Sequence, residues 1–259
     1  MGRTLFLWFM VLAACERSVA VGHEAVAGGG EAAAAGSSAV AGAPAVAGAP
    51  ALLWSADHET GTLDEWLSDD SGWLYTKGNG TVAISQAHAR SGDYSLAATI
   101  STEDGGMHQA VIARDVTLES GRYGAWYFFP EAPNADYWVV MKLSNAETER
   151  FDIDVHAPDG AEPRLRLFEH GADWITEPAA LPLPIGRWVL IEARYRSTPN
   201  EDGHLIVLQD GVAVLDTGPR STSNDARVSF IVGSVSWYIA GGPYSLYIDD
   251  ASIEAEAIQ

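Results

Sequence analysis

Three consecutive strand patterns in residues 186–218 constrain the fold of this chain more than any other feature. The first, Trp188–Arg196, alternates its side chains with the period of two that a half-buried strand requires. A polar turn leads into His204–Gln209. Asp210-Gly211 then provides the positive φ angles of a tight hairpin, and Val212–Asp216 follows. Together these segments predict three antiparallel strands.

Short strand patterns separated by turn residues continue through the rest of the chain. Trp73–Lys77 and Thr81–Ser85 flank Gly78-Asn79-Gly80, which is typical of a hairpin with a primed turn. No segment has the periodicity of a long amphipathic helix. The pattern predicts an all-β fold, a two-sheet antiparallel β-sandwich. The other expected strands are Tyr94–Ile100, His108–Val116, Gly121–Phe129, Tyr137–Ser144, Arg150–His156, Arg164–Glu169, Arg227–Val232, Ser236–Ile239 and Ser245–Glu254.

The charge balance restricts the class of ligand. The 259 residues include 35 acidic and 15 basic side chains, a formal net charge of −20. Nucleic acids and anionic lipid surfaces are themselves negative, so the composition argues against both as partners. It also disfavours a strongly sulfated or uronate-rich polysaccharide, although a local basic groove would overcome the overall charge.

The first fifteen residues resemble a bacterial lipoprotein leader. Arg3 precedes an apolar run over residues 4–14 that is too short to span a bilayer but suits the core of a signal peptide. The run ends in LAAC, which resembles a lipobox, and the resemblance implies that Cys15 is lipidated and becomes the mature N-terminus. The alternative is ordinary secretion with cleavage after Ala20. The leader predicts a cell-envelope location, with the membrane reached only through this lipid anchor.

Residues 16–51 are dominated by Ala, Gly, Val, Ser and Pro, and 39–50 are two copies of AVAGAP. Such side chains cannot bury enough surface to offset the entropy lost on ordering, so the segment predicts a flexible tether. A helix formed by the alanines is the alternative, but the repeated Gly and Pro disfavour it. The expected organisation is therefore a leader (1–15), a tether (16–51) and a folded domain (52–259).

Several short motifs follow one another in the domain: DHETG from Asp57, RSGDYSL from Arg90, GRYGAWYFFP from Gly121, the Asp-Gly hairpin, and LYIDD from Leu246. Their order resembles the concanavalin A-like jelly rolls, which include laminin-G-type modules and heparin- and alginate-lyase-type polysaccharide lyases. The opening and closing motifs also resemble β-sandwich carbohydrate-binding modules. The resemblance implies a jelly-roll fold and a polysaccharide or glycan as the partner.

Lyases of this group carry Arg-x-Glu-Leu, Gln-x-His and Tyr-x-Lys-x-Gly-x-Tyr strands, in which a His or Tyr moves a proton beside a uronate carboxylate. The corresponding strands here read HQAVIARDV, YWVVMKLS and SWYIAGGPY. Arg114 is present without the Glu-Leu, Lys142 stands near the expected Gln or His, and Tyr238 lacks a Lys two residues on. The catalytic set is not reproduced. This favours a carbohydrate-binding domain, and we assign no catalytic residue.

Two alternatives stay open. One is a divergent polysaccharide lyase in which His156 or Tyr238 transfers the proton and Arg114, Arg164 or Lys142 neutralises the substrate acid. The other is a non-catalytic surface adhesion or scaffold lipoprotein with a protein ligand. The appearance of an unsaturated product from uronate glycans distinguishes the lyase from the binding domain.

Period-two placement puts charged side chains from three successive strand patterns on one face. If these strands are neighbours, a concave sheet displays them beside Trp138, which offers an apolar platform for the C–H face of a sugar ring. The alternative is a solvated face of cross-strand ion pairs. Most other tryptophans, Trp237 among them, are expected in the core. The candidate ligand-binding residues are His108, Arg114, Trp138, Lys142, Asp152, Asp154, His156, Arg164, Arg166 and Tyr238.

Four carboxylates lie at the two ends of the domain: Asp57, Glu59, Asp249 and Asp250. The first and last strands of a sandwich are often neighbours, so we expect these groups to converge. With carbonyl groups of the 91–93 turn they would form an oxygen-only site suited to a structural Ca²⁺. The alternative is that they cap turns and end strands. The histidines have no zinc-site spacing.

Overall fold

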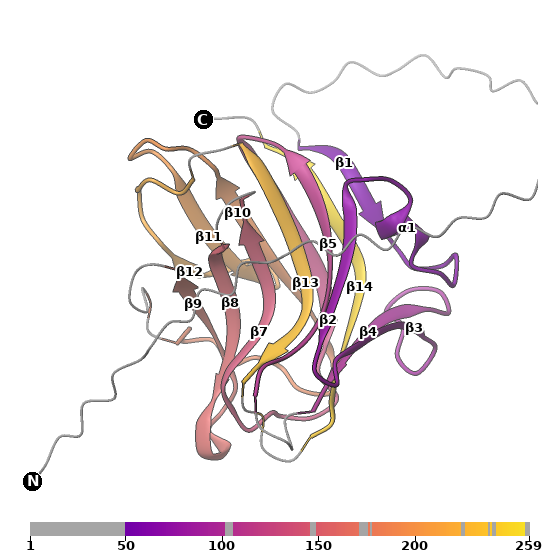
Figure 1. Ribbon diagram of the computed structural model, residues 1–259. Coiled ribbons are helices and arrows are strands. Elements are labelled where there is room, and N and C mark those ends of the chain that lie inside the picture. The colour runs from indigo at the N-terminus through magenta and orange to yellow at the C-terminus, as the bar shows by residue number, and fades with distance from the viewer. Residues whose placement is uncertain are drawn as a thin grey trace, which may run out of the picture. The chain divides into compact units, whose positions relative to one another are not determined.

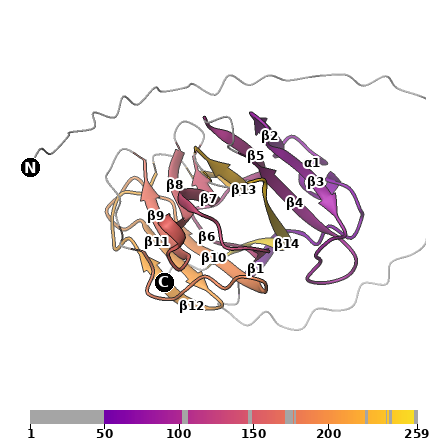
Figure 2. The same cartoon turned by 90° about the horizontal axis from the view of Figure 1, so that it is seen from below.

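Two antiparallel β-sheets stack face to face in the computed structural model of the protein (Figures 1 and 2). The predicted leader with Cys15, nearly all of the predicted tether and the candidate residue Tyr238 lie outside the described residues. The described residues are 50–101, 106–145, 149–170, 176, 178–223, 226–237, 239 and 242–256.

The larger sheet, called sheet A, has eight strands. Its order is β12-β11-β10-β6-β14-β4-β3, and β1 pairs with β14 off this path. The first and last strands of the domain are thus neighbours, as expected. The strands are β1 (Ala51–Ala56), β3 (Thr81–Ser85), β4 (Ser95–Ile100), β6 (Ser120–Phe128), β10 (Trp188–Arg196), β11 (His204–Gln209), β12 (Val212–Asp216) and β14 (Tyr244–Ala255).

The smaller sheet, called sheet B, has the order β2-β5-β13-β7-β8-β9. Two short helical segments, α1 (Asp64–Leu67) and η1 (Pro158–Gly160), accompany the sheets, and no helix of the described residues is long and apolar enough to cross a membrane. The strands of sheet B are β2 (Gly72–Lys77), β5 (His108–Thr117), β13 (Arg227–Ser236), β7 (Ala135–Ser144), β8 (Glu149–Ala157) and β9 (Arg164–Glu169).

The meander predicted from residues 186–218 is present as β10, β11 and β12. Each strand pairs antiparallel with the next, and Asp210 and Gly211 have φ angles of 50° and 78°. Both angles lie in the left-handed region that a primed two-residue turn requires. The alternating residues Val189, Ile191 and Ala193 of β10 are buried in the core between the sheets, which confirms the predicted period of two.

The core fills the space between the inner faces of the two sheets. Sheet A contributes Tyr123, Tyr127 and Ile191, and sheet B contributes Phe151 and Phe230, all with no exposed surface. Because each strand alternates its side chains, the faces turned away from this core are left to carry other side chains.

The chain between β2 and β3 crosses from sheet B to sheet A, so the hairpin predicted at residues 78–80 is wrong. β2 pairs with β5 and β3 pairs with β4. The turn is held from outside, because the amide of Asn79 donates to Nδ1 of His108 over 2.9 Å and its Oδ1 accepts from the amide of Ser101. The turn residues were recognised correctly, but local sequence does not show which sheet each strand joins.

A β-bulge in β7 reverses the expected direction of Trp138. The register shifts between Val139 and Met141, so that Val140 and Met141 both point into the core. Trp138 is 1% exposed and its Nε1 donates to Oγ of Ser234 over 2.6 Å. The predicted surface platform is therefore a core residue, because the bulge changes the alternation on which the prediction rested.

β13 runs on to Ser236, whereas separate strands over Arg227–Val232 and Ser236–Ile239 had been expected. Its register shifts between Val232 and Val235, and Gly233 lies in the shifted part with a φ of 140°. A Cβ atom at Gly233 would lie 2.1 Å from the carbonyl oxygen of Ala110. Only glycine allows the two strands to approach this closely.

Candidate functional site

The candidate site lies on the outer face of sheet B, where β7, β8 and β9 are consecutive neighbours. Asp152 on β8 lies opposite Lys142 on β7, and Asp154 lies opposite Arg166 on β9. The strand adjacency and the shared face agree with the prediction, whereas the role in binding stays a prediction. The predicted residues on this face are Lys142, Asp152, Asp154, His156, Arg164 and Arg166.

Asp152 is fully buried at the centre of a hydrogen-bonded network. Its Oδ2 accepts from Oη of Tyr137 over 2.6 Å and from Nε2 of His170 over 3.1 Å, and Nζ of Lys142 lies 3.4 Å from its Oδ1. Burial alone would raise the pKa of Asp152. The charge of Lys142 and the contacts with His170 and Tyr137 outweigh burial and lower this pKa below its usual value.

Asp154 is equally buried but differently surrounded. Nη2 of Arg166 forms an ion pair with its Oδ1 at 3.3 Å, yet neither carboxyl oxygen accepts a hydrogen bond within the described structure. Burial raises the pKa of Asp154 well above its usual value; Arg166 offsets this only in part, and the negative Asp152 and Asp136 add to it. Burial thus works against the ionised form of Asp154, whereas Arg166 works for it.

Two carboxyl groups on one strand thus have pKa values displaced in opposite directions. The pKa of Asp152 is lowered and that of Asp154 is raised, although only Ile153 separates them in the sequence. Environments that push the pKa values of neighbouring groups apart are typical of sites that carry out acid–base chemistry. Structural ion-pair networks displace pKa values in the same way.

The rim of the network is formed by partly exposed groups. Nδ1 of His156 lies 3.0 Å from the carbonyl oxygen and 3.2 Å from Oδ1 of Asp136. Arg164 donates to the carbonyl groups of Ala179 and Ala180 and forms an ion pair with Glu162 at 2.5 Å. The predicted residues His156 and Arg164 are therefore accessible but already fixed in position by neighbours.

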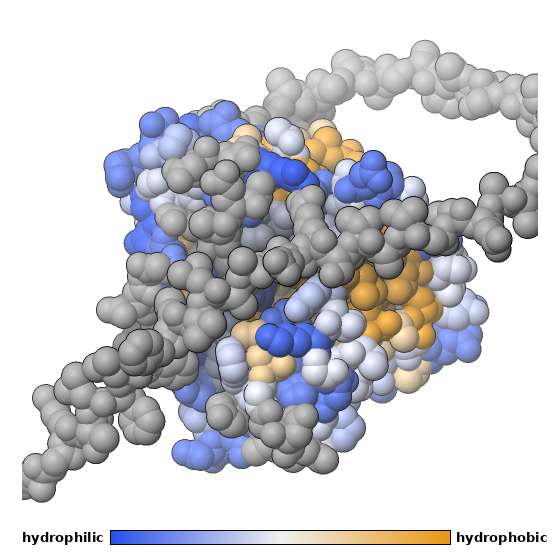
Figure 3. Space-filling view, in the orientation of Figure 1, coloured by the Kyte–Doolittle hydropathy of each residue, from blue (hydrophilic) through white to orange (hydrophobic). Residues whose placement is uncertain are grey.

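The remainder of the same face is apolar. A second cluster of buried side chains lies on β5, β13 and β7, and Trp73 and Tyr137 pack against it. Tyr137 therefore lies where the apolar and charged parts of the face meet. Members of the cluster are Val111, Ala113, Val139, Ile231 and Val235. In the view of Figure 3 the visible hydrophobic surface gathers near β2 and α1, and hydrophilic residues surround it.

Two candidate residues do not lie with this network. His108 is 2% exposed and its ring lies under the turn at Asn79. Arg114 forms an ion pair with Asp69 at 2.6 Å and donates to the carbonyl group of Trp66, at the end of the sandwich next to α1. The prediction had grouped both residues by their likeness to lyase strands, which gives no information on the face.

Two residues of the network, Tyr137 and His170, were missed, and the exposure of Trp237 was not expected. Tyr137 shares the outer face because of the bulge in β7, which no sequence signal showed. His170 follows β9 directly, and extending the alternation of Arg164, Arg166 and Phe168 by one step would have found it. Trp237, expected in the core, is 46% exposed.

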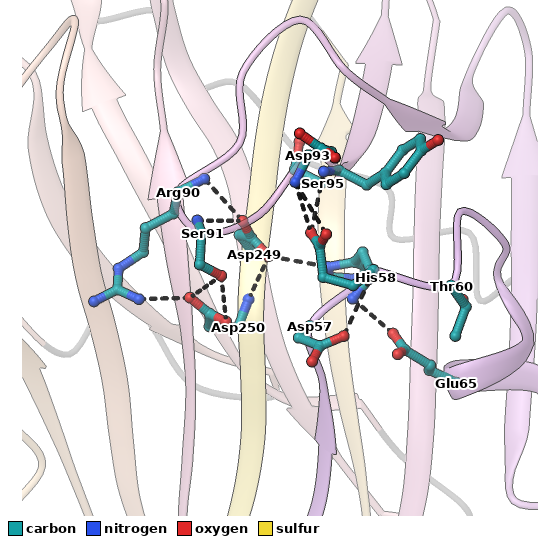
Figure 4. Close-up of polar contacts among 12 residues, drawn as sticks. Asp57, His58, Thr60, Glu65, Arg90, Ser91, Asp93, Ser95, Asp249 and Asp250 are labelled. Carbon is teal, nitrogen blue, oxygen red and sulfur yellow. Dashed lines mark hydrogen bonds and ion pairs between the residues drawn. The ribbon is translucent and has the colours of Figure 1, made fainter.

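The four predicted metal ligands serve as hydrogen-bond acceptors, and Figure 4 shows three of them, Asp57, Asp249 and Asp250, close to the turn that carries Ser91. The carboxylate of Asp249 accepts from the amides of Arg90, Ser91 and Asp250, and Asp250 forms an ion pair with Arg90 at 2.5 Å. Glu59 accepts from the amides of residues 93 and 94.

Among the described residues, no three acidic, His or Cys side chains are placed to hold a metal ion. The donor set therefore does not fit Ca²⁺, because backbone amides already bind the carboxylates of Glu59 and Asp249, and the side chains of Arg90 and Ser91 bind that of Asp250. A Cβ atom at Gly92 would lie 2.1 Å from the carboxyl group of Glu59, which shows how closely the turn approaches it. The alternative, that these residues cap turns, describes the structure better.

His58 completes this cluster in the interior. Its Nδ1 lies 3.3 Å from Oδ1 of Asp249, and its Nε2 accepts from Nε1 of Trp66 over 3.1 Å. Because Nε2 accepts, the neutral ring carries its proton on Nδ1 and donates it to Asp249. The backbone of His58 has a φ of 64°, so this residue joins β1 to α1 through a left-handed turn.

Comparison with known proteins identifies the fold. No family model matches the sequence, and no curated protein matches it. Solved structures do match. An endo-β-1,4-glucuronan lyase from the fungus Trichoderma reesei superposes with a TM-score of 0.60 at 14% identity, over 79% of this chain and 95% of that one. The fold is that of a concanavalin A-like jelly roll.

Two further structures support this assignment. The catalytic domain of a glycoside hydrolase family 131 protein from Coprinopsis cinerea matches with a TM-score of 0.57 at 16% identity, over 81% of this chain and 96% of that one. A cellulose-induced protein, Cip1, matches with a TM-score of 0.54 at 15% identity, over 77% and 95%. At these identities the likeness establishes the jelly-roll fold.

Proposed function

We propose that this jelly roll binds a polysaccharide or glycan on the outer face of sheet B, around Tyr137 and His170. The observation that carries the proposal is the buried carboxylate of Asp152, which orients both side chains from below. Burying an ion is costly, and a framework alone is served as well by apolar packing. A fixed phenol and imidazole at a surface suit the recognition of sugar hydroxyl groups, because their orientation is set before the ligand arrives.

The ligand meets the partly exposed groups and not the buried carboxyl groups. Asp152 and Asp154 have no exposed surface, so they act by positioning their neighbours. The side chains in reach of a glycan are Tyr137, His156, Arg164, Phe168 and His170. They combine hydrogen-bonding groups with aromatic surface, as sugar recognition requires.

The similar structures support a carbohydrate ligand by analogy of fold. One is named as a glucuronan lyase and another as a glycoside hydrolase catalytic domain, so two proteins with this architecture act on polysaccharides. A fold hosts many functions, and the proposal therefore depends on the Asp152 network and not on the fold.

One observation favours a second candidate function, a polysaccharide lyase. Asp152 orients a Tyr and a His together, the two side-chain types that transfer protons in β-elimination. In this alternative Tyr137 and His170 replace the predicted His156 and Tyr238 as the groups that move the proton. The ultraviolet absorbance of an unsaturated product, formed from uronate glycans, tests it.

We further propose that Cys15 is lipidated and holds the domain at the cell envelope. The LAAC sequence after an apolar run supports this. Metabolic labelling with a fatty acid tests it, with incorporation expected in the full chain and lost in Cys15→Ala. Equal labelling of the wild type and of Cys15→Ala would contradict the proposed lipidation at Cys15.

Glycan binding is tested by calorimetry. The full-length chain is titrated with a glycan that has been selected on a glycan array. The double variant Tyr137→Phe, His170→Ala removes two hydrogen-bonding groups, and we expect its affinity to fall about tenfold or more. Asp216→Asn is the matched control, because Asp216 contacts His204 on sheet A at 2.6 Å, away from this face. Unchanged affinity in the double variant would exclude this surface.

A further inference from the structure

The basic side chains around the Asp152 network already form ion pairs with carboxyl groups of the protein. Lys142 lies 3.4 Å from Asp152, and Arg166 lies 3.3 Å from Asp154. Arg164 lies 2.5 Å from Glu162. A uronate or sulfate group on a ligand would have to displace one of these partners. For Lys142 this would leave the buried carboxylate of Asp152 without its cation, which is strongly unfavourable.

The accessible charges at the rim are also unfavourable for an anionic ligand. The side chains of Asp136 and Glu162 are 80% and 57% exposed, beside His156 and Arg164 respectively. The whole chain carries a net charge of −20. Like charge at a binding surface lowers both the encounter rate and the affinity for a polyanion.

An exposed tryptophan stands next to this network. β13 ends at Ser236, so Trp237 follows the strand directly, and its side chain is 46% exposed. Oγ of Ser236 donates to the carbonyl oxygen of Tyr137 over 2.7 Å and fixes the strands there. The exposed Trp237 is therefore the next residue after the one that contacts the backbone of Tyr137.

An exposed indole beside hydrogen-bonding groups has a specific chemical preference. A pyranose with all its ring hydroxyls equatorial presents a continuous C–H face that stacks on an aromatic ring, and an axial hydroxyl interrupts that face. The hydroxyls at the edge of the same ring then reach Tyr137 and His170.

We propose that the site takes a neutral, gluco-configured glycan, with one sugar ring stacked on Trp237. The inference rests on the proposed glycan-binding function and adds the ligand class to it. It also separates this chain from a lyase, because β-elimination needs the uronate carboxylate that this face disfavours.

The test uses the full-length chain and three β-1,4-linked oligosaccharides of equal length. Cello-oligosaccharide is neutral and gluco-configured, oligoglucuronate differs from it by a carboxylate on each ring, and manno-oligosaccharide differs by an axial hydroxyl at C2 of each ring. We expect the first to bind at least about tenfold more tightly than either of the others. Trp237→Ala should weaken the binding of cello-oligosaccharide about tenfold, and Trp188→Ala on sheet A should leave this binding unchanged. Asp136→Asn with Glu162→Gln should strengthen binding of oligoglucuronate.

The outcomes separate this inference from the proposed function. Tighter binding of oligoglucuronate, still lost in the Tyr137–His170 double variant, would overturn the neutral ligand and leave glycan binding intact. Wild-type affinity in Trp237→Ala would overturn the stacking role. If none of the array glycans binds, the proposed function and this inference both fail.

Discussion

The hydroxyl group of Tyr137 donates to Oδ2 of Asp152 over 2.6 Å, and this contact joins the apolar and charged halves of the outer face of sheet B. The two residues come from neighbouring strands, and the bulge in β7 is what turns Tyr137 toward Asp152. With His170 on the other side, the carboxylate holds a phenol and an imidazole in fixed relation. The proposed site depends on this arrangement.

Replacing the two buried carboxyl groups should have opposite consequences for stability. Asp152→Asn removes the partner of buried Lys142 and should lower the free energy of unfolding by about 3 kcal/mol. Asp154→Asn replaces a group whose ionised form is disfavoured by burial and should leave stability unchanged or raise it. Urea unfolding of both variants at neutral pH checks this. Equal destabilisation by the two substitutions would contradict the opposite pKa displacements.

Asp152 and Asp154 should also affect the pH dependence of stability in opposite directions. The lowered pKa of Asp152 contributes stability above the unfolded value of about 3.9, and this is lost as pH falls through the folded pKa. The raised pKa of Asp154 acts oppositely, because ionisation costs stability as pH rises from about 3.9 toward the folded pKa. Asp154→Asn should therefore gain stability relative to the wild type as pH rises from about 4. If the difference in stability between Asp154→Asn and the wild type does not vary with pH, the pKa of Asp154 is not raised.

Replacing Trp138 and replacing Trp237 should change the free energy of unfolding by different amounts. The sequence had suggested that Trp138 is exposed and Trp237 buried, and the structure shows the reverse. Trp138→Ala leaves a cavity between the sheets and should cost about 3 to 5 kcal/mol. Trp237→Ala removes an exposed ring and should change stability by about 0.5 kcal/mol or less. Thermal and urea unfolding distinguish them. A large loss in Trp237→Ala would place its ring in a packed environment.

A chelator should not change the thermal stability of the protein. The carboxylates first considered for Ca²⁺ accept hydrogen bonds from backbone amides and pair with Arg90. We therefore expect the same melting temperature with and without EDTA. A fall in the presence of EDTA that added Ca²⁺ reverses would show an ion site that the described residues do not form.

Sequence periodicity was sufficient for the strands and the fold class. The Asp210-Gly211 turn and the alternation in β10 gave three strands with their bounds, because local φ preferences and period-two burial decide these features. The adjacency of the strands that carry Lys142, Asp152 and Arg166 also followed, since consecutive short strands usually pair with each other.

The remaining features depend on packing between distant segments. One extra residue at Val140 inverts the faces of Trp138 and Tyr137, and nothing in the local sequence marks it. The turn at Gly78 joins different sheets because its partners are His108 and Ser101, far along the chain. The opposite pKa displacements of Asp152 and Asp154 likewise arise from tertiary contacts.

The most direct test of the central claim is NMR of the tryptophan indole N–H groups during titration of the full-length chain with a bound glycan. Signals are assigned with Trp237→Phe and Trp188→Phe, one ring near the proposed site and one on the outer face of sheet A. The account predicts that the Trp237 resonance shifts with saturation and that the Trp188 resonance stays in place. A shift of Trp188 with no change at Trp237 would move the glycan to the opposite sheet and contradict the account.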